Sequence, residues 1–235
     1  LYQRPENSAL APFYQKVLDL GWTEVISSPS TCNLALERAA SIVEEMTRKR
    51  PELRRRLQEQ QVRISIIGRR QRLTDIPEHS DLEKAFPNFP WNQRRGVGPT
   101  KERPVTSCAE ENLLQLSSDP YRGQCILVHE FAHALMDMAL EPEFVERIRQ
   151  AYSRAISQGL WTGTYAATDA KEYWAEGAAD WFDCNRQSIP SDGIHNEINT
   201  QAELREYDPQ LAYLLSQVFD NDLCWDRRTL VERVP

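Results

Sequence analysis

One short stretch, from Cys125 to Met136, constrains the fold of this chain more than any other. Its letters are Cys-Ile-Leu-Val-His-Glu-Phe-Ala-His-Ala-Leu-Met, so apolar residues flank His129, Glu130 and His133 on both sides. Such a run predicts a helix that is buried on most sides. The two histidines are four residues apart, so they lie one turn apart on the same face. Buried imidazoles need partners for their nitrogens, and the chain must therefore fold around a polar cluster.

This pair of histidines has the spacing of a metal site. Two imidazoles one helical turn apart can bind one Zn²⁺ through their nitrogens at about 2.0–2.1 Å. Glu130 follows the first histidine and faces the same cleft, where it can accept a proton from a metal-bound water. The alternative is a helix whose histidines only form hydrogen bonds in a polar crevice, which leaves buried nitrogens to be satisfied in some other way. We favour the metal site, and zinc then needs a third protein ligand and one open position.

A second helix is the obvious source of the third ligand. Glu172, Glu176 and Asp180 follow one another at intervals of four, which places an acidic stripe along one helix face. An acidic stripe is usually a solvated surface, but this one is flanked by Tyr173, Trp174, Trp181 and Phe182. The aromatic residues predict a largely buried helix, whose carboxylates need partners. One acid can bind the metal while the next accepts a hydrogen bond from a ligand histidine, and spacing alone does not say which is which.

Together these two segments resemble the glutamate-ligand zinc peptidases (gluzincins), and among them the anthrax lethal factor and Pro-Pro endopeptidase group. That group carries a His-Glu-x-x-His helix, then a tyrosine, then a glutamate seven residues after the tyrosine, and a second acid four residues further on. Here Tyr165 precedes Glu172 by seven residues, and Glu176 follows by four. The resemblance covers roughly residues 125 to 182, about a quarter of the chain.

The resemblance assigns roles to individual residues. It implies that Glu172 is the third zinc ligand, that the Tyr165 hydroxyl stabilises an oxyanion, and that Glu176 is the outer partner of a ligand histidine. Asp137, one turn after the motif, and Asp180 are candidates for further outer acids. The alternatives are an ordinary semi-buried tyrosine at position 165 and a plain helix residue at position 137.

The sequence thus predicts a zinc-dependent peptidase that holds one Zn²⁺ ion and acts on a peptide or protein. In this chemistry Glu130 takes the proton of a metal-bound water during attack on a peptide carbonyl, and passes it to the leaving amine. Two alternatives stay open: a catalytically silent zinc-binding or interaction module of the same fold, and a zinc hydrolase that acts on a non-peptide amide. The remaining histidines, His79 and His195, lie in loop-like segments and are expected to be surface residues.

The remaining patterns predict an α+β fold: a single helix-rich, zincin-like domain over residues 1–235 with a small mixed β-sheet. Helical periodicity predicts helices over residues 33–50, 52–60, 122–140, 145–158, 170–184 and 209–219. Alternating β-branched residues predict a strand over 62–67, and a short strand is expected around 105–108. Residues 73–107 are rich in proline and glycine and predict a long loop that shapes the substrate groove. The N-terminal helical and strand part then covers about 1–107, and the metal-site helices about 122–184.

Charge and composition narrow the possible partners. The formal net charge of -7 disfavours a general nucleic-acid binder, which needs a basic face. A basic run over residues 48–56 alternates with glutamates in a helical pattern and predicts a solvated helix face. No stretch approaches the roughly 18 apolar residues of a membrane span.

The cysteines bear on the compartment. None forms a Cys-x-x-Cys pair, so a cysteine zinc site is not expected. Their number suits one or two disulfides in a secreted protein, and reduced thiols in a cytoplasmic protein are the alternative. Neither the pairing nor the oligomeric state follows from the sequence. The five residues are Cys32, Cys108, Cys125, Cys184 and Cys224.

Overall fold

The computed structural model describes residues 2–4, 6 and 8–220. Within these residues one sheet contains five strands in the order β1-β2-β3-β5-β4. Their bounds are β1 (Lys16–Asp19), β2 (Glu24–Ser27), β3 (Arg63–Ile67), β4 (Gly96–Val97) and β5 (Val105–Ala109). Strands β2, β3 and β5 are parallel to one another, whereas the outer strands β1 and β4 run antiparallel to their neighbours. The predicted α+β fold with a small mixed sheet is confirmed.

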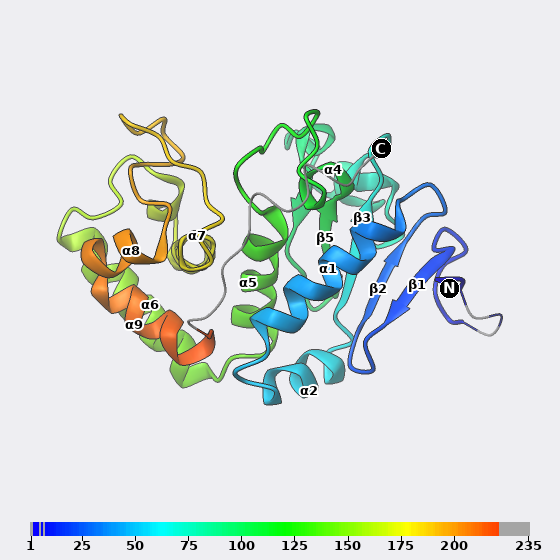
Figure 1. The fold of residues 1–235 in the computed structure, drawn as a ribbon, viewed down its shortest axis with the longest axis horizontal. Helices are drawn as coiled ribbons and strands as arrows, with labels where there is room; N and C mark the ends of the chain where they lie inside the picture. Colours follow the sequence, from blue (N-terminus) through cyan, green and yellow to red (C-terminus); the bar gives the residue numbers. More distant parts are fainter. Residues whose placement is uncertain (1, 5, 7, 221–235) are drawn as a thin grey trace.

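Helices cover one face of this sheet. Helix α1 (Asn33–Met46) contacts β2 and β3, and helix α5 (Ile126–Met138) contacts β5 and β4. The buried positions of α1 recur at three- and four-residue steps, as the sequence predicts. Figure 1 shows α5 in the middle of the molecule, with the sheet on one side and the helices α6 (Pro142–Ser157), α7 (Ala170–Trp181), α8 (Gln201–Tyr207) and α9 (Pro209–Val218) on the other. Helix α5 is therefore the element that both halves share.

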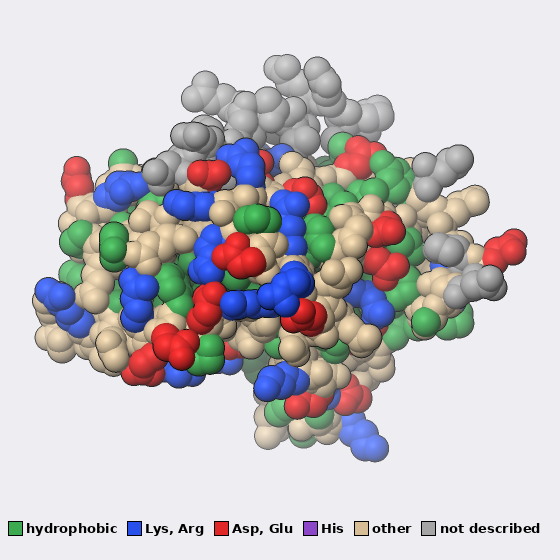
Figure 2. Space-filling model, turned by 90° about the horizontal axis from the view of Figure 1, so that it is seen from below, with side chains coloured by type: hydrophobic (Ala, Val, Ile, Leu, Met, Phe, Trp, Pro, Cys, Tyr) green, Lys and Arg blue, Asp and Glu red, His purple; other side chains and the backbone are tan. Residues whose placement is uncertain are grey.

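Helix α2 (Glu52–Glu59) carries much of the basic run. Arg50 lies 2.6 Å from Glu52 and 2.9 Å from Glu141, and Arg55 lies 2.6 Å from Glu59. Figure 2 shows the molecule from the side on which α2 lies, and basic and acidic side chains alternate over that face. The run is thus a solvated face with local ion pairs, as predicted.

The predicted elements differ from the observed ones in several places. Strands β1 and β2 and helix α8 lie where no strand or helix was predicted. The long segment predicted as a loop also contains short helices: η1 (Leu73–Asp75), η2 (Pro77–His79), α3 (Leu82–Ala85) and η3 (Trp91–Gln93). Helix α4 (Glu110–Leu113) follows β5 directly. Helix α5 begins at Ile126 rather than near residue 122, because Gly123 adopts a positive φ of 95°, which lies outside the helical region.

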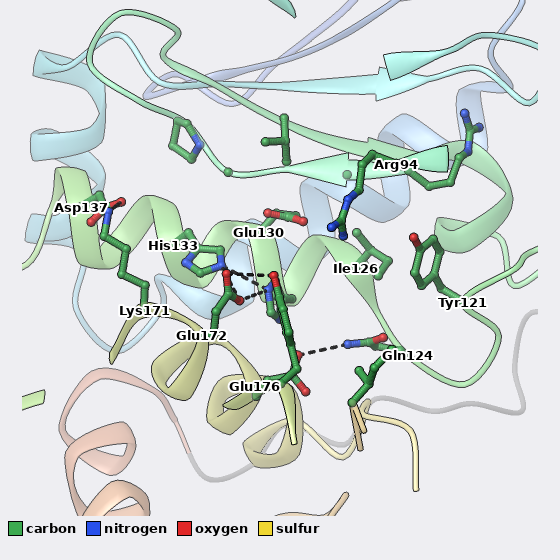
Figure 3. A pocket seen from close by; sticks show the side chains of 18 of the residues that line it. Arg94, Tyr121, Gln124, Ile126, Glu130, His133, Asp137, Lys171, Glu172 and Glu176 are labelled. Carbon is green, nitrogen blue, oxygen red and sulfur yellow. Dashed lines mark hydrogen bonds and ion pairs between the residues drawn. The ribbon is translucent and has the colours of Figure 1, made fainter. Parts of the chain in front are cut away.

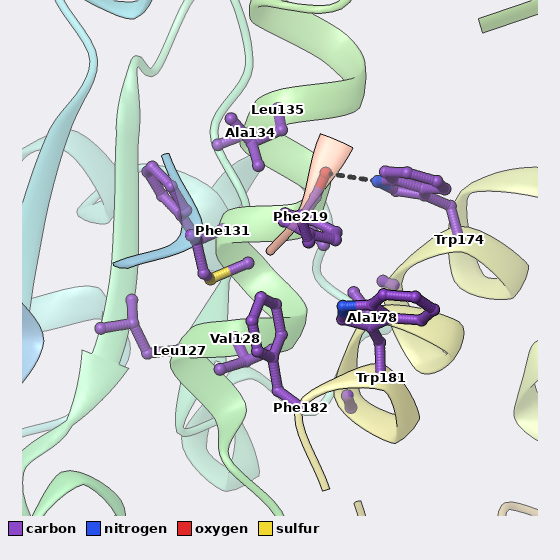
Figure 4. Packing of buried hydrophobic residues seen from close by; sticks show 14 of the residues in the cluster. Leu127, Val128, Phe131, Ala134, Leu135, Trp174, Ala178, Trp181, Phe182 and Phe219 are labelled. Atoms are coloured by element: carbon purple, nitrogen blue, oxygen red, sulfur yellow. Dashed lines mark hydrogen bonds between the residues drawn. The ribbon is translucent and has the colours of Figure 1, made fainter. Parts of the chain in front are cut away.

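The packing between α5 and α7 forms the centre of the larger core. Trp174 and Trp181 of α7 are almost fully buried, and the Trp174 indole donates a hydrogen bond of 3.2 Å to the Ala132 carbonyl of α5. Figure 4 shows the Trp174 indole beside Phe219, and the two rings stack with their centroids 5.8 Å apart. The prediction of a largely buried acidic helix is confirmed, and its rigid packing fixes one helix against the other.

Two further predictions concern the cysteines and the membrane. No disulfide bond joins Cys32, Cys108, Cys125 and Cys184, the cysteines that the structure describes; the expected disulfide therefore has no support among them, and Cys224 lies outside the described residues. In the described part of the chain, no helix has both the length and the apolar character of a membrane span.

Candidate metal centre

Three side chains bring one atom each to a common point. His129 Nε2 lies 3.1 Å from His133 Nε2, and Glu172 Oε2 lies 3.0 Å from the first and 3.3 Å from the second. In a tetrahedral zinc site with bonds of about 2.0–2.1 Å, neighbouring ligand atoms are about 3.3 Å apart. The triangle of ligand atoms therefore has nearly the size that a tetrahedrally coordinated cation requires. Figure 3 shows Glu172 and His133 pointing toward one another across the two helices.

Local structure explains why Glu172 reaches the histidines of α5. Asp169 caps the start of α7, and its Oδ1 accepts hydrogen bonds from the backbone amides of Lys171 at 2.8 Å and Glu172 at 3.0 Å. This cap fixes the first helical turn, where Glu172 lies. Two residues later the Trp174 indole binds the α5 backbone. Glu172 is thus held in place from both sides in the chain.

Glu176 approaches the same histidine from its other nitrogen. Its Oε1 lies 2.9 Å from His129 Nδ1, and its side chain is almost completely buried. Gln124 donates a hydrogen bond of 3.4 Å to Oε1, and Asn185 donates one of 3.0 Å to Oε2. A carboxylate that accepts a hydrogen bond from Nδ1–H favours the tautomer whose Nε2 lone pair is free to bind a metal.

The electrostatics of the cluster call for a cation. Burial alone would raise the pKa of Glu172, yet His129 and His133 lower it well below its usual range. Burial would lower the pKa of His129, but Glu172 and then Glu176 raise it well above its usual range. Glu172 Oε2 is buried and accepts no hydrogen bond of good geometry. Buried carboxylates around two imidazoles are stabilised by positive charge, and a divalent ion bound to both Nε2 atoms and Oε2 would supply it. The two histidines and Glu172 therefore fit a divalent metal ion.

Glu130 and Tyr165 lie next to this triangle. Ligand-capable atoms of His129, Glu130 and His133 all lie within 4.8 Å of one another. Burial raises the pKa of Glu130, and the neighbouring histidines oppose the rise. Tyr165, in the short helix η4 (Tyr165–Ala167), donates a hydrogen bond of 3.2 Å to Glu172 Oε1. Both side chains line the same pocket.

The other expected outer acids lie further away. Asp137 pairs with Lys171 at 2.7 Å and lines the pocket, with no bond to a histidine. Asp180 accepts a hydrogen bond of 2.8 Å from Asn185, the residue that also holds Glu176. Burial, and next the charge of Glu176, raises the pKa of Asp180 well above its usual range. Asp180 thus reaches the site through Asn185.

His79 and His195 were expected to be surface residues, and this expectation is wrong. His79 is 1% exposed and His195 is 7% exposed, so neither is a surface residue. The His79 ring lies against Ser107 of β5 at 2.8 Å, and His195 Nδ1 lies 3.6 Å from Asp192. Tertiary packing buries these rings although both belong to irregular segments.

Sequence reasoning missed several residues of the site. Gln124 and Asn185 hold Glu176 from segments that no motif marks. Gly96 and Gly98 bring the edge strand against α5, because a Cβ on Gly96 would lie 3.1 Å from Glu130 Cγ and one on Gly98 would lie 2.9 Å from His133 Cβ. The alternation Gly-Val-Gly is the one signal that could have indicated such a close approach.

Comparison with known proteins places the fold. No family model matches the sequence, and no curated protein matches it. Among solved structures, the chain is similar to the structure of the Pro-Pro endopeptidase PPEP-2 from Paenibacillus alvei, with 16% sequence identity and a TM-score of 0.54. The similarity covers 83% of this chain and 97% of that chain. At this identity the likeness establishes a shared fold.

Proposed function

We propose that this chain is a zinc-dependent peptidase of the glutamate-ligand type. The observation that carries the proposal is the triangle of His129 Nε2, His133 Nε2 and Glu172 Oε2, with sides of 3.0 to 3.3 Å. These three atoms would hold a zinc ion, which would supply Lewis acidity toward a water and a carbonyl oxygen. The shared fold with an endopeptidase supports a peptide as the substrate.

Residues of the chain would then transfer the proton, stabilise the oxyanion and orient a ligand histidine. Glu130, with a pKa that burial raises, can take a proton at its carboxylate and give it to the leaving amine. The Tyr165 hydroxyl, which lies beside Glu172, can donate a hydrogen bond to the developing oxyanion. Glu176 holds His129 through Nδ1 and so orients the ring.

Two other functions use the same fold. A silent zinc-binding module would keep the three ligands and need neither Glu130 nor Tyr165 in the pocket, yet both line it. A hydrolase of non-peptide amides would use the same ligands, and only the likeness to an endopeptidase favours the peptide.

The test combines metal analysis with turnover. Purified protein should contain about one zinc per chain, and it should cleave members of a diverse peptide library until a chelator is added. The Glu130→Gln variant should keep its zinc and lose turnover by orders of magnitude. Protein without stoichiometric metal would refute the proposed centre, and full turnover in the variant would remove Glu130 from the mechanism. Metal without any cleavage would favour the silent module.

A further inference from the structure

The pocket contains a cation that has no ion-pair partner in the described part of the chain. Three cationic side chains line it: Arg94, Arg95 and Lys171. Lys171 lies 2.7 Å from Asp137, and Arg95 lies 2.6 Å from Glu111. Within residues 2–4, 6 and 8–220, no carboxylate lies within ion-pair distance of Arg94. Two of the three charges are therefore matched inside this part of the protein, and the third is not.

Aromatic residues hold Arg94 in place. Its guanidinium lies 4.8 Å from the centre of the Phe89 ring, and Phe89 in turn lies 4.3 Å from Trp91. The Trp91 indole donates a hydrogen bond of 3.1 Å to the Phe86 carbonyl, which closes the segment on itself. Stacking of this kind orients a guanidinium without using its hydrogen-bond donors. As far as the described residues go, the guanidinium donors of Arg94 thus stay available for a ligand.

The orientation of Arg94 decides what it can contact. Figure 3 shows its side chain reaching from the segment before β4 toward Glu130 and the interior of the pocket. Its charge acts on Glu130 and on Tyr165, the two residues proposed to handle protons. A group bound by Arg94 would therefore lie beside the bond to be cleaved rather than at a distant surface.

The chemistry of the guanidinium identifies its ligand. Its planar fork of donors matches a carboxylate with two parallel hydrogen bonds, and a half-buried unpaired charge gains most from such a partner. We propose that Arg94 binds a carboxylate of the substrate, so that the site selects peptides with an acidic side chain or a free C-terminus beside the cleaved bond. This inference rests on the proposed peptidase function.

Matched peptides test this selection. The zinc-loaded protein is given a synthetic peptide mixture with free C-termini and the same mixture with amidated C-termini. The cleaved peptides are then made as pairs that differ only in Glu against Gln, or only in acid against amide at the terminus. We expect kcat/KM to favour one of these carboxylates by about 10- to 100-fold, the range for a hydrogen bond to a charged group. The pair that shows the ratio identifies the source of the carboxylate.

Three variants assign the ratio to Arg94. Arg94→Gln should abolish this ratio, because kcat/KM falls more for the acidic member of each pair than for its neutral partner, and Arg94→Lys should retain part of the ratio because only the charge remains. Lys101→Gln is the matched control, since Lys101 is exposed, lies on the same segment and does not line the pocket. It should leave the ratio unchanged. Equal losses on acidic and neutral peptides in Arg94→Gln would overturn the proposal and give Arg94 a general role in turnover.

A binding measurement tests the carboxylate site separately from the peptidase activity. Fluorescein-labelled Glu and Gln peptides are titrated into the Glu130→Gln protein, with and without Arg94→Gln, and anisotropy is measured. Cleavage of both members of every pair at equal rates would overturn the carboxylate proposal and leave the peptidase intact. Without cleavage, tighter binding of the Glu peptide that depends on Arg94 would support the carboxylate site alone. Equal binding, or none, would overturn it.

Discussion

A single methyl group placed on β4 should disturb both stability and turnover. Gly96 faces α5, and a Cβ built there would lie 2.3 Å from Ile126 Cγ2 and 3.1 Å from both Glu130 Cγ and the Ser107 carbonyl oxygen. Ordinary contacts of a Cβ begin near 3.4 Å. In Gly96→Ala, therefore, β4 or the first turn of α5 must move by about 1 Å, the distance by which the closest contact falls short.

The change in the free energy of unfolding of Gly96→Ala follows from two opposed effects. Overpacking of this kind costs about 1–3 kcal/mol, whereas replacing a glycine in a strand returns about 0.5–1 kcal/mol of backbone entropy. We expect a net loss of about 1–2 kcal/mol in the free energy of unfolding. A shift of about 1 Å at Glu130 should also lower kcat up to about 100-fold, because proton transfer depends steeply on geometry.

Urea unfolding and hydrolysis of the best library peptide measure the two effects. Ile126→Ala removes the Cγ2 atom of the closest contact and serves as the partner in a double-mutant cycle. The double variant should be more stable than the sum of the single losses predicts, by about 1 kcal/mol. Strict additivity, or wild-type stability and turnover in Gly96→Ala, would mean that β4 does not lie against α5 as described.

Four further changes probe the site and the core. Glu176→Gln should weaken zinc binding about 10- to 100-fold in a chelator competition, and unchanged affinity would remove Glu176 from the support of His129. Tyr165→Phe should lower kcat about 100-fold while zinc affinity changes little, and an unchanged kcat would contradict an oxyanion role. Trp174→Ala should cost about 3–5 kcal/mol in urea unfolding, because the indole is fully buried, and a loss below about 1 kcal/mol would contradict its packing. Burial lowers the pKa of His79 to about 4, so its neutral form contributes stability that is complete above pH 6.5 and declines as the pH falls from 6.5 toward 4. His79→Gln should flatten the stability profile in that window by up to about 3 kcal/mol, and an unchanged slope would contradict the shift.

The sequence contained enough information to predict the helix of His129 and the burial of the acidic helix. Both follow from local rules: a four-residue repeat defines a face, and aromatic neighbours define the inside. The choice of Glu172 over Glu176 as third ligand came from the resemblance, because both acids lie on one face. In the structure they contact opposite nitrogens of one imidazole, a distinction that depends on how α7 crosses α5.

What the sequence did not predict depends on long-range contacts. Strands β1 and β2 have four residues each, too few for a clear alternation. His79 is buried because β5 lies beside it in space, and Ser107 is 28 residues away in the chain. Asn185 reaches Glu176 only because the chain turns back after α7, where Asp183 adopts a φ of 51°. The residue types at these positions do not predict such contacts.

The three acids of α7 show how one helical repeat can yield three environments. Residues four apart on a helix rise by about 6 Å, so successive carboxylates reach different depths. The Glu172 side chain is 17% exposed at the pocket, and the Glu176 side chain is 4% exposed behind the His129 ring. One turn deeper, burial and next the charge of Glu176 raise the pKa of fully buried Asp180 well above its usual range. Asp180 shares the Asn185 amide with Glu176 and contacts no histidine itself. The pKa is therefore lowered at the two acids that contact His129 and raised at the third, which lies behind them.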